Sequence, residues 1–77
     1  MNKYLIPICD IEAGSCWIHI IMAKSLRDCK EKFISEIIDY YNFDEIDDSM
    51  DYSEFVKLLS SSDYNIIIGN IKDIEEL

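Results

Sequence analysis

The side chains best suited to chemistry in this chain are three cysteines and a single histidine. A structural zinc ion needs four such ligands converging tetrahedrally, and a Cys–His nucleophile needs its two side chains in contact. Cys16 and His19 have a suggestive spacing, but three residues apart on one strand they point to opposite faces. The sequence also has no C-x-x-C pair. With no convincing secretion signal, Cys9, Cys16 and Cys29 are expected to be reduced thiols that hold neither zinc nor a disulfide.

Carboxylates are the second chemically capable group. Eight of them lie between positions 36 and 54 with no Lys or Arg among them: Glu36, Asp39, Asp44, Glu45, Asp47, Asp48, Asp51 and Glu54. A calcium loop requires oxygen ligands at alternate positions, a glycine at the sixth and a glutamate at the twelfth. A loop starting at Asp44 has Ile46 at its third position, and one starting at Asp47 has Tyr52 at its sixth. An EF-hand is therefore excluded, which leaves a weak cation site among the acids of residues 44–48 as a minor alternative.

Catalysis finds no further support in the sequence. There is no glycine-rich phosphate loop and no cluster of basic residues for an anionic substrate. The paired carboxylates lie in a polar stretch, without the apolar pocket that would raise a carboxyl pKa for acid catalysis. The chain is therefore expected to be neither an enzyme nor a cofactor-binding protein.

A sharp change in charge near residue 35 points instead to a partner. Residues 1–35 carry five bases and four acids, whereas residues 36–77 carry twelve acids against only Lys57 and Lys72, a charge of −10. Unpaired carboxylates repel one another and oppose compaction. The eight acids between positions 36 and 54 are therefore predicted either to bind a positively charged partner or to serve as a solvated face.

Length and net charge limit the other classes. The 77 residues are enough for one domain, and no apolar run approaches the ~18 residues of a membrane-spanning helix. A net charge of −9 repels nucleic acid and anionic lipid surfaces, so direct binding to either is not expected. The expected location is the cytoplasm.

The strands that must position these side chains follow from their β-branched residues and turns. Residues 4–11 and 16–23 are predicted to form an antiparallel hairpin that turns at Gly14. Pro7 cannot donate a ladder hydrogen bond, so the first strand is expected either to lie at a sheet edge or to place Pro7 outward. The third strand, residues 64–69, contains three consecutive isoleucines and is expected to be central.

Two helices follow from spacing and capping residues. Apolar residues recur every three or four positions over residues 26–41, and Ser25 precedes them as an N-cap, which predicts a 16-residue amphipathic helix. A second capping signal at Asp51 predicts a short helix over residues 51–60. Residues 71–77 have an apolar residue at every third position and are expected to add either a helical turn or an edge segment.

The predicted fold is a small α+β domain spanning residues 1–77. Its element order is ββααβ, in two layers, with a three-stranded, largely antiparallel sheet and two helices on one face. The even-numbered positions of the second strand are expected to face the helices. The odd-numbered face, with Trp17 and Ile21, is then exposed beside Leu5, Pro7 and Cys9, unless the tail covers it. An exposed apolar patch of this kind marks an interface, so Trp17 is predicted to bind a partner or a second copy in a homodimer.

Three functions remain, one of which is a small housekeeping domain whose charge serves only solubility; the other two involve a partner protein. The first is an inhibitor that offers its acids to a basic, nucleic-acid-binding protein, as DNA mimics of phages and mobile elements do against restriction or CRISPR systems. The second is a general protein–protein interaction module, such as an antitoxin, immunity protein or complex subunit, that uses the exposed sheet face. Acids gathered on one ridge would favour the first function, and scattered acids with a flat apolar sheet face would favour the second.

Overall fold

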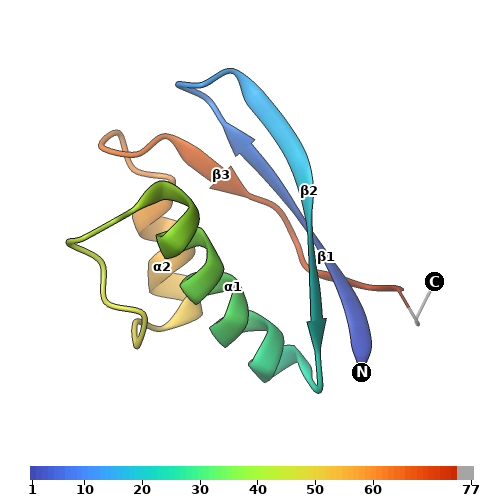
Figure 1. Ribbon diagram of the computed structural model, residues 1–77. Coiled ribbons are helices and arrows are strands. Elements are labelled where there is room, and N and C mark those ends of the chain that lie inside the picture. Colours follow the sequence, from blue (N-terminus) through green and yellow to red (C-terminus); the bar gives the residue numbers. More distant parts are fainter. Residues whose placement is uncertain (75–77) are drawn as a thin grey trace.

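A computed structural model describes residues 1–74 and shows a sheet with two helices packed on one of its faces (Figure 1). The elements in chain order are β1 (Asn2–Asp10), β2 (Ser15–Ala23), α1 (Leu26–Tyr41), α2 (Tyr52–Leu59), β3 (Ile66–Ile68) and β4 (Lys72–Asp73). All strand pairings are antiparallel. The predicted two-layer α+β architecture is confirmed.

The helix boundaries agree with the capping residues. The Ser25 side chain accepts a hydrogen bond from the Asp28 amide at 3.1 Å, and Asp51 accepts one from the Ser53 amide at 3.1 Å. Each of these satisfies one of the free N–H groups in the first turn of a helix. α1 ends where Asn42 adopts the left-handed conformation with φ of 57°, which asparagine tolerates better than most residues. Local chemistry therefore fixes both ends of α1 and the start of α2.

The strand order corrects the sequence prediction. β1 is the central strand, with β2 on one side and β3 on the other. Cys9 faces Cys16 across the first pairing and Ile67 across the second. For the strand that contains Pro7, the alternative of an edge position is wrong, and so is the central position expected for the triple-isoleucine strand.

A bulge explains how the central strand accommodates Pro7. Ile8 pairs with Ile68, and Leu5 pairs with Lys72. The two pairs are three residues apart along β1 but four residues apart along the neighbouring segment. β3 and β4 are thus two parts of one edge strand with an extra residue between them, which is a β-bulge. Proline is tolerated within sheets at such bulges, and the sequence prediction did not allow for one.

The bulge lies where the missing proline N–H would have pointed. Cys9 and Cys16 form a close pair, with Cα atoms 4.1 Å apart, as in a non-hydrogen-bonded antiparallel pair. Pro7 lies two residues from Cys9 along β1, so it too occupies a non-hydrogen-bonded position relative to β2. Its backbone polar groups therefore face the edge strand on the other side. There its carbonyl accepts a hydrogen bond from the Gly69 amide at 2.8 Å. A Cβ atom on Gly69 would lie 3.1 Å from the Pro7 ring, so glycine suits this close approach.

The two faces of the hairpin are reversed relative to the sequence prediction. The odd-numbered residues of β2 face the helices, and Ile21 and Ala23 are fully buried there. The even-numbered residues, which were expected in the core, are exposed. Polar groups on the odd face find partners among the helices, as when His19 Nε2 lies 3.0 Å from Glu36 Oε1. That pairing makes burial of the less apolar face possible.

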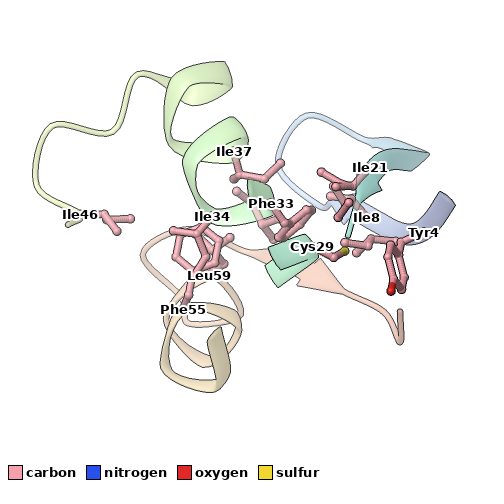
Figure 2. Packing of buried hydrophobic residues seen from close by; sticks show 13 residues of the cluster. Tyr4, Ile8, Ile21, Cys29, Phe33, Ile34, Ile37, Ile46, Phe55 and Leu59 are labelled. Carbon is pink, nitrogen blue, oxygen red and sulfur yellow. The ribbon is translucent and has the colours of Figure 1, made fainter. Parts of the chain in front are cut away.

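The core lies between the covered sheet face and the helices (Figure 2). Phe33 of α1 and Phe55 of α2 are fully buried and meet edge to face, with ring centroids 6.4 Å apart. Ile46, from the connection between the helices, is also buried beside them. The fully buried side chains outside the hairpin come mainly from positions three or four apart on each helix, namely Cys29, Phe33, Ile37, Phe55 and Leu59.

The two edges of the sheet differ. β2 forms one edge, and over its nine residues it has no Lys, Arg, Asp or Glu. β3 and β4 form the other edge, which matches the predicted edge segment for the tail, with Ile71 packed against the core. Leu77, which completes that predicted pattern, lies outside the described residues.

The reversed faces predict opposite effects for two neighbouring isoleucines of β2. Ile21→Ala should lower the free energy of unfolding by about 2–5 kcal/mol, because it leaves a cavity in the core. Ile20→Ala, the matched control on the other face, should cost less than about 1 kcal/mol. Urea denaturation followed by circular dichroism gives both values. Equal losses would mean that the even-numbered face is covered and that the face assignment is wrong.

Candidate functional site

The face of the sheet away from the helices is an apolar surface, which we call the open sheet face. It consists of alternate residues of three strands: Leu5, Pro7, Cys9, Cys16, Ile18, Ile20, Met22 and Ile67. Ile18 and Ile20 are 53% and 56% exposed. Both helices pack on the other face (Figure 1), so no described helix shields these side chains.

The strand register makes the open sheet face continuous. Ile20 lies opposite Leu5, and Ile18 lies opposite Pro7. Directly opposed side chains on one face of a sheet have Cβ atoms about 4.5–5.5 Å apart, close enough to form one surface. Lys3 and Lys72 are exposed on the same face at the end nearest the N-terminus. The surface is therefore apolar along the hairpin and basic at one end.

Trp17 is not part of this surface. It lies on the helix-covered side of β2, is partly buried, and has its ring 5.7 Å from that of Tyr40. Ile21, expected beside it on an exposed patch, is 1% exposed. Leu5, Pro7 and Cys9 do lie on the exposed side, but with Ile18 and Ile20 rather than with Trp17. The predicted grouping is wrong because the assignment of the β2 faces was reversed.

The cysteines also depart from the sequence prediction. Cys9 and Cys16 are opposed across the hairpin and joined by a disulfide, whereas all three thiols were expected to be reduced. Hairpin register could have indicated this pair, because the seven-residue separation places both on one face at adjacent positions. Cys29 is a free thiol, fully buried on α1, and burial raises its pKa to about 11. A thiol held protonated in this way is a poor nucleophile.

The disulfide bears on location. Disulfides persist mainly in oxidising compartments, and the reduced state was expected because the chain was assigned to the cytoplasm. No helix within residues 1–74 combines the length and apolar character needed to cross a membrane. The cytoplasmic location itself stays a prediction.

All eight predicted acidic site residues are exposed, and all belong to the helical layer. Four of them are hydrogen-bonded within the chain: Glu36 with His19, Glu45 with Tyr64, Asp47 with Ser49 and Asp51 with Ser53. The hydrogen bond from the Tyr64 hydroxyl, at 2.7 Å, lowers the pKa of Glu45. Hydrogen bonds from Ser49 similarly lower the pKa of Asp47. Half of the cluster thus has a structural role that needs no partner.

The other four acids are Asp39, Asp44, Asp48 and Glu54. Asp39 is on α1, Glu54 is on α2, and Asp44 and Asp48 lie in the connection between them. Within residues 1–74 no group of three or more His, Cys, Asp and Glu side chains is arranged to hold a metal ion. What these acids present is a field of negative charge on the side of the molecule away from the open sheet face.

One buried polar pair escaped the sequence prediction. Asp10, at the end of β1, is only 9% exposed and accepts a hydrogen bond from the Tyr41 hydroxyl at 2.8 Å. Burial, followed by this bond, raises the pKa of Tyr41. The Asp10 side chain also accepts from the Ala13 amide at 3.1 Å, which ties the hairpin turn to the C-terminal end of α1. Nothing in the spacing of two residues this far apart indicates the contact.

A comparison of this chain with known protein families, with curated proteins and with solved structures finds no match.

The disulfide predicts a definite thiol count. The unfolded, unreduced protein should react with a thiol reagent at one cysteine, Cys29, and at all three after reduction. The native protein should react at none, because Cys29 is buried. Reduction should also lower the free energy of unfolding by about 2 kcal/mol, as expected for a cross-link that closes a short loop.

The control for this measurement is Cys9→Ser/Cys16→Ser. Its stability should match that of the reduced wild type and should not respond to reductant. Three reactive thiols in the unfolded, unreduced wild type would show that the sulfurs are not bonded.

Proposed function

We propose that this chain is a protein–protein interaction module that docks a partner protein on the open sheet face. The observation that carries the proposal is the exposure of the four large apolar residues Ile18, Ile20, Met22 and Ile67, each between 44% and 56%, on one continuous surface. Contiguous apolar surface of this kind marks an interaction site more often than not. Single exposed apolar residues are common, but four aligned by strand register are not scattered singles.

The mechanical properties of the face favour docking. β1 and β2 are long strands paired over nine residues each, and the disulfide joins them near the turn. A surface held in this way loses little conformational entropy on binding, which lowers the cost of association. The partner chemistry that fits is an apolar centre with an acidic rim where Lys3 and Lys72 lie.

The test is a pair of conservative polar substitutions on the face. Ile18→Thr/Ile20→Thr keeps the β-branched shape that suits a strand and adds two hydroxyl groups. Both side chains are exposed, so the melting temperature should change little. Immobilised wild-type protein should retain a partner from lysate of its native host, and the double variant should lose at least tenfold in affinity for it. Unchanged affinity would remove the open sheet face from the interaction.

A second copy of the chain is a separate outcome of the same experiment. Sedimentation over a range of concentrations distinguishes a dimer, which the double variant should dissociate, from a monomer that binds a different protein. A monomeric wild type that retains no partner would contradict the proposal.

The acidic helical layer supports a second candidate, the binding of a basic, nucleic-acid-binding protein. Its support is the net charge of −9 together with the exposure of all eight acids between positions 36 and 54. A dense field of carboxylates speeds association with a basic groove. The inhibitor and DNA-mimic interpretation depends on this layer alone and does not use the open sheet face.

The second candidate predicts a charge-dependent association rate. Asp44→Asn/Asp48→Asn should slow association with a captured basic partner at low salt, and added salt should remove the difference, because exposed charges are screened beyond ~8 Å at physiological ionic strength. Glu12→Gln/Asp63→Asn removes the same charge from the hairpin turn and the loop before β3 and is the matched control. The measurement is the association rate at two salt concentrations. Equal slowing by both double variants would attribute the effect to net charge and reject a specific acidic site.

A further inference from the structure

A groove of about 530 Å³ lies between the two helices and the β3–β4 segment, away from the open sheet face. Its apolar walls include Leu26, Val56 and Ile71, and its polar groups include Lys30, Tyr52 and Asn70. Small-molecule sites in proteins are typically concave spaces of ~300–1,000 Å³ with apolar walls and a few polar groups. The volume and lining of this groove fall within that description.

The bulge in the edge strand forms one wall of the groove. Gly69, Asn70 and Ile71 connect β3 to β4 opposite Pro7, and all three line the groove.

The charge of the groove is opposite to that of the molecule. The lining contains one cation, Lys30, and no carboxylate, in a chain with sixteen acids and a net charge of −9. Lys30 Nζ lies 5.3 Å from the centre of the Tyr52 ring. No ion pair within residues 1–74 includes Lys30. Its charge is available to an anion that enters the groove.

Tyr52 contributes its ring, and not its hydroxyl, to the groove. The hydroxyl is buried and has no hydrogen-bond partner among the described residues. Burial raises the pKa of Tyr52 to about 12, so the hydroxyl stays protonated at neutral pH. Because the hydroxyl oxygen is buried, it does not meet a ligand that lies in the groove.

We propose that this groove binds a small amphiphilic monocarboxylate. Its carboxylate pairs with Lys30, and its apolar body lies along Leu26, Val56 and Ile71. A single cation selects one negative charge, and a polyanion finds no second cation in the lining. The site is separate from both proposed protein-binding surfaces.

The probe is decanoate, used below its micellar concentration, with 1-decanol as its uncharged counterpart. We expect decanoate to give saturable changes in the amide NMR signals of residues 69–71 and of the first turn of α2. Lys30→Gln should weaken binding by about tenfold, since a hydrogen bond to a charged group contributes roughly that factor. Lys57→Gln removes the same charge from an exposed position outside the groove and should leave affinity within about twofold.

Tyr52→Phe separates binding from structure. It keeps the ring beneath Lys30 and removes only the unpartnered hydroxyl, so the melting temperature should stay equal or rise. Affinity for decanoate should stay within about twofold, because the buried hydroxyl does not reach the ligand. Equal losses of affinity for Tyr52→Phe and Lys30→Gln would contradict recognition of the carboxylate by Lys30.

Three results would overturn the proposal. One is the absence of saturable binding by decanoate. Another is equal binding of decanol and decanoate, or equal effects of Lys30→Gln and Lys57→Gln, because neither is compatible with recognition of the carboxylate. The third is signal changes centred on Ile18 and Ile20, which would place the fatty acid on the open sheet face instead.

Discussion

Every strand of the sheet is hydrogen-bonded to β1, so the register of that one strand decides which side chains are covered. Its even-numbered residues Tyr4, Ile6 and Ile8 are buried under the helices, and its odd-numbered residues contribute to the open sheet face. Because the period of a strand is two residues, a slip of one would exchange the two sets along the whole hairpin. The register of β1 therefore determines both which residues form the core and which form the open sheet face.

With both helices on one side, the molecule has two unlike surfaces. The helical layer carries most of the acidic residues, including all eight between positions 36 and 54, and the sheet presents an apolar face with two lysines at one end. The separation matters physically, because an apolar contact on the sheet need not bring the carboxylates of the helical layer into the interface, where desolvation would be costly. One molecule can therefore hold an apolar docking face despite a net charge of −9.

Local sequence signals predicted the helices and the two-layer architecture. They did not predict which face of β2 is covered or where the Pro7 strand lies in the sheet, because both depend on contacts between residues far apart in sequence. Ser25 and Asp51 act on the residues beside them, and their caps were confirmed. The covered face of β2 depended on partners far away in sequence, such as Glu36 for His19, so strand alternation could not select it. The same holds for Pro7, whose place in the central strand requires a bulge more than sixty residues later. The eight acids were located correctly as exposed residues, but their local hydrogen bonds were not foreseen.

The free edge of β2 has a consequence for how the protein behaves at high concentration. Natural edge strands are usually protected from pairing with other chains by charged side chains, prolines or bulges. β2 has no Lys, Arg, Asp, Glu or Pro in its nine residues. Protection against sheet extension must therefore come from the repulsion between whole molecules that their acidic layers produce. Resistance to aggregation in this protein therefore depends on the acidic helical layer, although the strand edge that could pair with another molecule belongs to the sheet.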